Sequence, residues 1–127
     1  MPQFDKHFTL EEANAALPLV LSVFERVHEL TMELKKKKKT LDTLHKSAPT
    51  NGGHKKGAEL AAISDNITGL MSQLEAKGIL IKDVDSGLVD FPHLRDGEEV
   101  LLCWRLGERK IGYWHDLESG YQGRQPL

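Results

Sequence analysis

The sequence predicts an α+β fold: a long antiparallel α-hairpin, followed by a small three- to four-stranded antiparallel sheet and an irregular C-terminal tail. Two observations predict this fold. Apolar residues recur at alternating spacings of three and four over residues 10–41 and 60–74, which is the period of an amphipathic helix. After Gly78 the pattern changes to short runs rich in β-branched and aromatic residues, separated by turns that contain glycine.

The first helix is expected to begin at the capping box Thr9-Leu10-Glu11-Glu12. In such a box the Thr9 and Glu12 side chains each accept a hydrogen bond from the other residue's backbone amide. Pro18 lies inside the apolar seam that follows. Because proline removes a backbone donor and clashes with the preceding turn, we expect a kink or break near Leu17.

The second helix completes the predicted hairpin. A stretch rich in glycine and proline, residues 47–53, is expected to end the first helix and form the connecting loop. The second apolar seam follows Gly57, and Gly78 stands where a C′ glycine would end the helix. We therefore expect an α-hairpin over residues 8–78. Chains of this length usually form one domain, so residues 1–127 are expected to be a single domain.

Residues 79–127 are expected to form a β-meander and the tail. The first predicted β-hairpin joins residues 79–84 to residues 88–91 through a turn that ends in glycine. In the register that we favour, Lys82 faces Asp90, because opposite charges on facing strands attract. In this register the role of Asp90 is to form a charge pair with Lys82.

A second β-hairpin is predicted from strands over residues 99–105 and 110–115, after a turn at residues 93–97. We favour the register that pairs Arg105 with Lys110, because it gathers the better apolar set on one face. That face would hold Val100, Leu102, Trp104, Ile111, Tyr113 and His115. A slip of one residue would exchange the two faces of a strand, so this choice decides which side chains meet.

Five stretches of the chain carry a family resemblance. They are Phe8-Thr9-Leu10-Glu11-Glu12-Ala13-Asn14, Gly78-Ile79-Leu80-Ile81-Lys82-Asp83, Gly87-Leu88-Val89-Asp90-Phe91-Pro92, Leu102-Cys103-Trp104-Arg105-Leu106-Gly107-Glu108 and Tyr113-Trp114-His115-Asp116-Leu117-Glu118-Ser119-Gly120-Tyr121-Gln122-Gly123-Arg124. Together they resemble an uncharacterised bacterial family, catalogued as domain of unknown function 2203. The resemblance covers both ends of the chain and the β region. It implies no activity, so no functional residue is carried over from it.

Composition excludes several classes of protein. The chain carries 17 basic and 19 acidic residues, a formal charge of −2, and 39% hydrophobic residues, which is ordinary for a globular protein. A single cysteine, Cys103, excludes a disulfide framework and a Cys-rich zinc site within one chain. No apolar run is long enough for a membrane span, and the N-terminus lacks the apolar core of a signal peptide. We therefore expect a cytoplasmic protein that makes no membrane contact and needs no cofactor.

One basic region interrupts this near-neutral balance. Residues 32–57 hold eight lysines against two acidic residues, so that 8 − 2 = +6. Five of these lysines are consecutive: Lys35, Lys36, Lys37, Lys38 and Lys39. Such a run attracts phosphate without sequence specificity, so weak nucleic-acid contact is one interpretation. The alternative, which we favour, is that these lysines form a solvated helix end.

Reactive side chains are densest in the C-terminal part of the chain. The ligand-binding candidates are Arg105, Glu108, Trp114, His115 and Arg124. The two arginines could hold a carboxylate or phosphate, and Glu108 with His115 could act as an acid/base pair. Cys103 with His115 could be a nucleophile and its base, or two zinc ligands. The favoured register points these two side chains to opposite faces, so neither a metal site nor cysteine-based catalysis is expected.

Two classes of function remain open. We favour a non-enzymatic binding or interaction module that acts through its helical hairpin, which resembles a coiled coil, because no nucleophile–base, metal or phosphate-loop motif is recognisable. The alternative is a small-molecule protein or enzyme that binds an anionic ligand at the C-terminal cluster. A homodimer through the helices is also expected, because one hairpin seam should not bury all of its large apolar residues. These residues are Val20, Leu21, Val23, Phe24 and Leu30.

Overall fold

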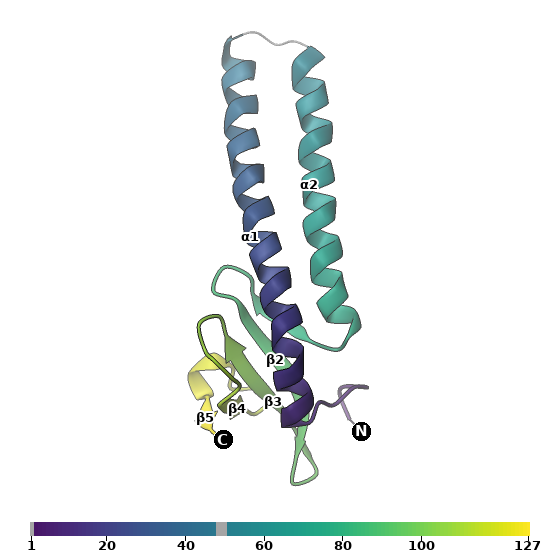
Figure 1. Ribbon diagram of the computed structural model, residues 1–127, viewed down its shortest axis with the longest axis vertical. Helices are drawn as coiled ribbons and strands as arrows, with labels where there is room; N and C mark the ends of the chain where they lie inside the picture. The colour runs from purple at the N-terminus through teal and green to yellow at the C-terminus, as the bar shows by residue number, and fades with distance from the viewer. Residues whose placement is uncertain (1, 48–50) are drawn as a thin grey trace. The chain divides into compact units, whose positions relative to one another are not determined.

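The computed structural model describes the backbone of residues 2–47 and 51–127, and the side chains of residues 2–40 and 55–127. Two helices packed as a hairpin precede a five-stranded antiparallel sheet with strand order β1-β2-β3-β4-β5 (Figure 1). The elements are α1 (Leu10–Ser47), α2 (Asn51–Ala76), β1 (Leu80–Asp83), β2 (Leu88–Arg95), β3 (Glu98–Arg105), β4 (Tyr113–His115), a 3-10 helix η1 (Tyr121–Gly123) and β5 (Gln125–Pro126). The predicted fold class is confirmed. The tail adds a fifth strand of two residues to the three or four expected.

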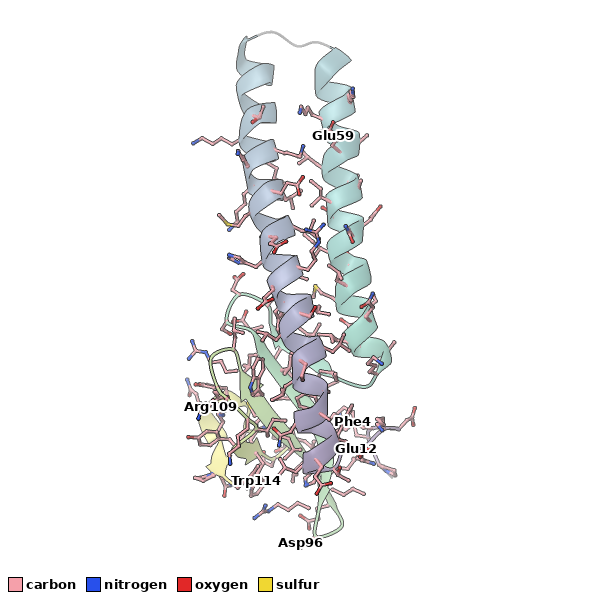
Figure 2. All side chains as sticks on the ribbon, in the orientation of Figure 1. Phe4, Glu12, Glu59, Asp96, Arg109 and Trp114 are labelled. Atoms are coloured by element: carbon pink, nitrogen blue, oxygen red, sulfur yellow. The ribbon has the colours of Figure 1, made fainter. Side chains whose placement is uncertain are left out.

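The chain divides into two compact units. The sheet unit comprises residues 1–24 and 73–127, and the hairpin unit comprises residues 25–72. The sheet unit therefore holds the first turns of α1, the last turn of α2 and all five strands. In the hairpin unit, Lys37 of α1 lies 3.3 Å from the carboxylate of Glu59 on α2. Glu59 is labelled in Figure 2.

The start of α1 is as predicted. The Thr9 amide donates to Glu12 Oε1 over 2.9 Å, and the Glu12 amide donates to Thr9 Oγ1 over 3.0 Å. The expected break near Leu17 is wrong, because α1 continues through Pro18 to Ser47. A proline removes a single helical hydrogen bond, to the carbonyl four residues earlier. Buried apolar residues on both sides of Pro18 outweigh that loss.

The two ends of α2 differ in how well the sequence predicts them. The helix begins at Asn51, so Gly52 and Gly53 are helical rather than part of the loop; residues 48–50 lie outside the described residues. Its C-terminal end is as predicted. Gly78 has a φ of 90°, its amide donates to Glu75 O, and the Ile79 amide donates to Leu74 O. These two bonds form a Schellman motif, which glycine favours because it has no Cβ.

The β1–β2 hairpin differs from its predicted register, and the turn between β2 and β3 is shorter than predicted. Asp90 pairs with Leu80 rather than Lys82, because Leu88 pairs with Asp83 rather than Val84 and the ladder shifts by one more residue between Ile81 and Asp83. The predicted Lys82–Asp90 pair is therefore wrong. Strand β2 also continues through most of the turn predicted at residues 93–97 and ends at Arg95. The actual turn is Asp96-Gly97, and both residues have positive φ, as a tight two-residue hairpin requires.

The register between β3 and β4 is shifted by one residue from the one we favoured. Cys103 pairs with Tyr113, and Leu101 pairs with His115. The Arg105–Lys110 register is therefore wrong. The loop that follows β3 is held by remote contacts that keep its last residues out of the ladder: the Ile111 amide donates to Asn14 Oδ1, and the Leu127 amide donates to Gly112 O.

Alternation along the strands defines two faces of the sheet. The helix face holds Val89, Phe91, Leu102, Trp104 and Trp114. The Phe8 ring, just before α1, packs edge-on against Phe91 with ring centroids 5.3 Å apart. The tail face holds Asp90, Cys103, Tyr113 and His115. Arg124 of the tail reaches it, with its guanidinium 4.1 Å from the Tyr113 ring centroid.

The reason we gave for a dimer is not upheld. Four of the five apolar residues that seemed too many for one seam are buried within the chain: Val20, Val23, Phe24 and Leu30. Only Leu21 is exposed, to 39%. The homodimer therefore stays a prediction that has lost its main support.

Candidate metal centre

Three buried polar side chains meet on the tail face of the sheet. Asp90 of β2 pairs directly with Cys103 of β3, and His115 of β4 lies diagonally from Cys103. One possible ligand atom from each lies within 4.8 Å of the other two. All three residues are at most 2% exposed. The corrected register is what brings His115 to the same face as Cys103.

The hydrogen bonds of His115 define which of its nitrogens is protonated. Nδ1 lies 2.7 Å from the backbone oxygen of Asp116, which can only accept, so Nδ1 carries a hydrogen and donates it. Nε2 lies 3.1 Å from Asp90 Oδ2. In a neutral ring, Nε2 would then be an acceptor that faces a carboxylate oxygen. That contact is favourable only when a proton or a metal ion lies between the two atoms.

Asp90 also has an unused oxygen. Among the described residues, nothing donates a hydrogen bond to Asp90 Oδ1, although this atom is buried. A buried polar atom without a partner costs about 1–3 kcal/mol. A cation bound beside the carboxylate would offset that cost.

The third member of the cluster is a thiol that is held protonated. Burial, followed by the negative charge of Asp90, raises the pKa of Cys103 from 9.0 to about 12. A thiol with this pKa is a poor nucleophile. His115 also cannot activate it, because both of its ring nitrogens are engaged by Asp116 O and Asp90 Oδ2. The cysteine–histidine dyad that the sequence left open is therefore not formed.

The donor set fits a transition-metal ion. A thiolate sulfur, an imidazole nitrogen and a carboxylate oxygen are the ligand types that zinc takes in proteins. The bond from Nδ1 to a backbone carbonyl is the usual support of a metal-binding histidine, since it directs the Nε2 lone pair toward the ion. A bound ion would stabilise the thiolate and so reverse the effect that burial has on Cys103.

Two of the candidate residues predicted from sequence form a pair beside this cluster. Arg124 Nη2 lies 2.7 Å from both carboxylate oxygens of Glu108. Glu108 Oε1 also accepts from the Arg105 backbone amide, and Arg124 Nη2 lies 3.4 Å from the Cys103 carbonyl. The Arg124 guanidinium therefore has a carboxylate partner inside the protein.

Arg105 and Trp114 are not members of the cluster, but the guanidinium groups of Arg105 and Arg124 both lie over the Tyr121 ring, 5.9 and 4.7 Å from its centroid. The Arg105 side chain is exposed and shares a shallow pocket with Asp83 and Tyr121. Trp114 is on the helix face, where the Arg95 guanidinium lies 4.5 Å from its ring centroid. Of the five candidates, only His115 belongs to the metal-type cluster, and Asp90 was predicted only as the partner of Lys82. The available signal was a carboxylate between Val89 and Phe91, inside a strongly apolar strand.

Comparison with known proteins assigns the chain to a family. The model of a family described as uncharacterized conserved protein (DUF2203) matches residues 6–127. The chain belongs to this family. No curated protein matches it, and no solved structure matches it. The DUF2203 match is wider than the stretches that carried the resemblance, because its range includes the hairpin tip.

The basic run of this DUF2203 member is only partly solvated. Lys37 is half-buried and paired with Glu59, whereas Lys35, Lys36 and Lys38 are exposed. Nucleic-acid contact through the run stays a prediction. Within the described part of the chain, neither helix has a stretch apolar enough to span a membrane.

Proposed function

We propose that this protein binds a divalent transition-metal ion, of which zinc fits best, through Asp90, Cys103 and His115. One observation carries the proposal: His115 Nε2 faces Asp90 Oδ2 at 3.1 Å, while Nδ1 donates to a backbone carbonyl. The earlier expectation of no metal site depended on a register that placed Cys103 and His115 on opposite faces. The observed register places Cys103 and His115 on the same face of the sheet, so both side chains can bind one ion.

The proposed role of the ion is structural. All three ligand residues are buried, and they come from three adjacent strands, β2, β3 and β4. Three protein ligands would leave the fourth position of a tetrahedral site to water, and the burial of all three keeps a substrate away from that position. An ion held here would join the short strand β4 to the centre of the sheet. Its binding free energy would therefore add to the stability of the sheet unit.

The other functions remain less supported. An anion site at Arg105 and Arg124 is disfavoured, because Arg124 is paired with Glu108 and Arg105 shares its pocket with Asp83. An interaction module that acts through the helical hairpin stays a prediction, which was favoured because no catalytic motif was recognisable.

Cobalt titration tests the proposal directly. Metal-free protein is titrated with Co²⁺, both as folded protein and during refolding from urea, so that burial cannot hide binding. We expect a thiolate-to-cobalt charge-transfer band that saturates at one ion per chain and is lost when Zn²⁺ displaces the cobalt. Cys103→Ser should abolish the band, and His115→Gln should abolish stoichiometric binding.

The chain offers a matched control. His7 and Glu99 form a second imidazole–carboxylate pair, with 2.7 Å between Nε2 and Oε2, but Cys103 is the chain's only cysteine and belongs to the other cluster. The variant His7→Gln should therefore bind cobalt like the unmodified protein. If the unmodified protein binds no cobalt under either condition, the proposal is wrong. In that case ¹⁵N NMR should find a proton on Nε2 of His115.

A further inference from the structure

A groove of about 540 Å³ lies on the helix face of the sheet unit, between the first turns of α1 and the loop that follows β3. Its apolar lining comes from Leu17, Pro18, Leu21 and Trp104. Leu21 is 39% exposed, although the apolar residues around it in α1 are buried. The volume is in the range of small-molecule sites, which are mostly apolar with a few polar groups.

Two hydrogen bonds hold the walls of this groove in place. Trp104 Nε1 donates to the backbone oxygen of Glu108 over 2.9 Å, which ties the indole to the loop. The Ile111 amide donates to Asn14 Oδ1 over 2.8 Å, which ties the end of the loop to α1. The groove therefore exists before any ligand enters, and a preformed site loses little conformational entropy on binding.

The charges around the groove favour an anion. Arg109, which is labelled in Figure 2, and Lys110 line it from the loop and are exposed. No ion pair is found for either among the described residues. The one acidic residue in the lining, Glu108, is already paired with Arg124. Two positive charges without an acidic partner therefore stand at the edge of an apolar surface.

Pro18 adds a hydrogen-bond acceptor. Because proline has no N–H, the backbone carbonyl of Asn14 lacks the donor that a helix normally supplies from four residues ahead. Asn14 lines the groove as well.

We propose that the groove binds a small organic anion with a flat apolar body, such as an aromatic carboxylate. The carboxylate would lie at Arg109 and Lys110, and the ring would pack against the exposed Pro18 and Leu21, above Trp104, which is only 3% exposed. Aromatic faces supply large contact areas, and guanidinium binds carboxylates in a bidentate manner. The proposal does not depend on the metal site, because Trp104 and Cys103 are on opposite faces of the sheet.

Fluorescence of Trp104 provides the test. In a Trp114→Phe background, Trp104 is the only tryptophan and reports on the groove alone. The probes are 3-phenylpropionate, its uncharged amide, and acetate, which lacks the ring. We expect saturable quenching by 3-phenylpropionate at millimolar concentration or below, with binding at least tenfold weaker for the amide and for acetate.

Charge variants locate the binding. Arg109→Gln combined with Lys110→Gln should weaken the affinity for 3-phenylpropionate at least tenfold. The matched control, Lys77→Gln with Lys82→Gln, removes two exposed positive charges elsewhere in the sheet unit and should leave the affinity unchanged. The proposal is overturned if no quenching occurs at 10 mM probe, if the amide binds as well as the acid, or if the two double variants behave alike.

Discussion

His115 Nε2 lies 3.1 Å from Asp90 Oδ2 in the buried part of the sheet, while Asp90 Oδ1 has no hydrogen-bond partner among the described residues. The two residues are 25 positions apart and come from strands on either side of β3. Their contact is favourable only with a positive charge between them, which either a proton or a metal ion supplies. The pair of Asp90 and His115 therefore stabilises the sheet, whether it holds a proton or a metal ion.

Removing one partner of this pair should be costly. In metal-free protein, Asp90→Ala should lower the free energy of unfolding by about 3–5 kcal/mol, because it leaves the imidazole buried without its counter-charge. Urea denaturation measures the change. The control Asp65→Ala removes an exposed carboxylate and should change stability by no more than about 0.5 kcal/mol. A similar, small effect of the two substitutions would show that the buried pair contributes nothing.

The thiol of Cys103 should be nearly inert in the native protein. Its pKa is raised from 9.0 to about 12, so near neutral pH its thiolate fraction falls about 1000-fold relative to an ordinary cysteine. Alkylation by iodoacetamide at pH 8 should be slower by at least that factor than in urea-unfolded protein. Because this is the only cysteine, mass spectrometry gives an unambiguous answer. Native and unfolded rates within tenfold of each other would contradict the raised pKa.

The same shift predicts a loss of stability in alkaline solution. A group whose pKa is raised on folding contributes stability that is fully present below its unfolded pKa and is lost as the pH rises through the folded value. For Cys103 that window runs from about 9 to about 12. The variant Cys103→Ala should show a flatter decline of unfolding free energy across this range. Equal slopes for both proteins would rule out a contribution from the thiol.

Zinc should stabilise the fold in proportion to its affinity. An ion that binds only the native state adds about 2.7 kcal/mol at a free concentration of 100 times Kd. Thermal unfolding should therefore shift upward with added Zn²⁺ and return to its starting value with a chelator. The shift should be absent in Cys103→Ala and retained in His7→Gln. A shift of equal size in Cys103→Ala would place the ion somewhere else.

Glu99 should make the N-terminal segment sensitive to acid. Its two carboxylate oxygens accept from the Gln3 and Phe4 amides over 2.6 and 3.0 Å. The Gln3 amide, followed by His7, lowers the pKa of Glu99 from 4.5. A lowered pKa means that the stability is present above pH 4.5 and is lost as the pH falls through the folded value.

Hydrogen exchange measures this contact. Glu99→Gln should speed exchange of the Gln3 and Phe4 amides at pH 6 and should flatten the dependence of stability on pH below 4.5. Its neighbour Glu98 is exposed, so Glu98→Gln should leave both properties unchanged. Slow exchange that persists in the Glu99 variant would show that other contacts hold the segment.

Most features that depend on neighbouring residues could be predicted from the sequence. The capping box of Thr9 and Glu12 and the end of α2 at Gly78 involve atoms within five positions of one another. The helix-breaking tendencies of proline and glycine predicted some helix ends wrongly. Pro18 lies inside α1, because the buried apolar residues around it stabilise the helix more than the proline opposes it. Gly52 and Gly53 also lie inside a helix, α2.

The candidate site could not be predicted in the same way. His115 was named from sequence, and Cys103 was considered, but the register that we favoured separated them. Both registers of the β3–β4 pair place apolar residues on both faces of the sheet, so the sequence pattern differs little between them. The deciding contact is the bond from the Ile111 amide to Asn14, over 97 positions. No local pattern signals such a bond.

The sequence by itself determined the α+β class, the helix that starts at Thr9, the left-handed glycine that ends α2 and the relation to an uncharacterised family. Each depends on periodicity or on atoms close together in the chain. Only the tertiary structure decided that Asp90, Cys103 and His115 meet, and that Arg109 and Lys110 stand beside an apolar groove. Those groupings depend on strand register and on how the loop after β3 docks on α1. Because a shift of one residue inverts every side chain of a strand, long-range contacts alone settle which groups share a site.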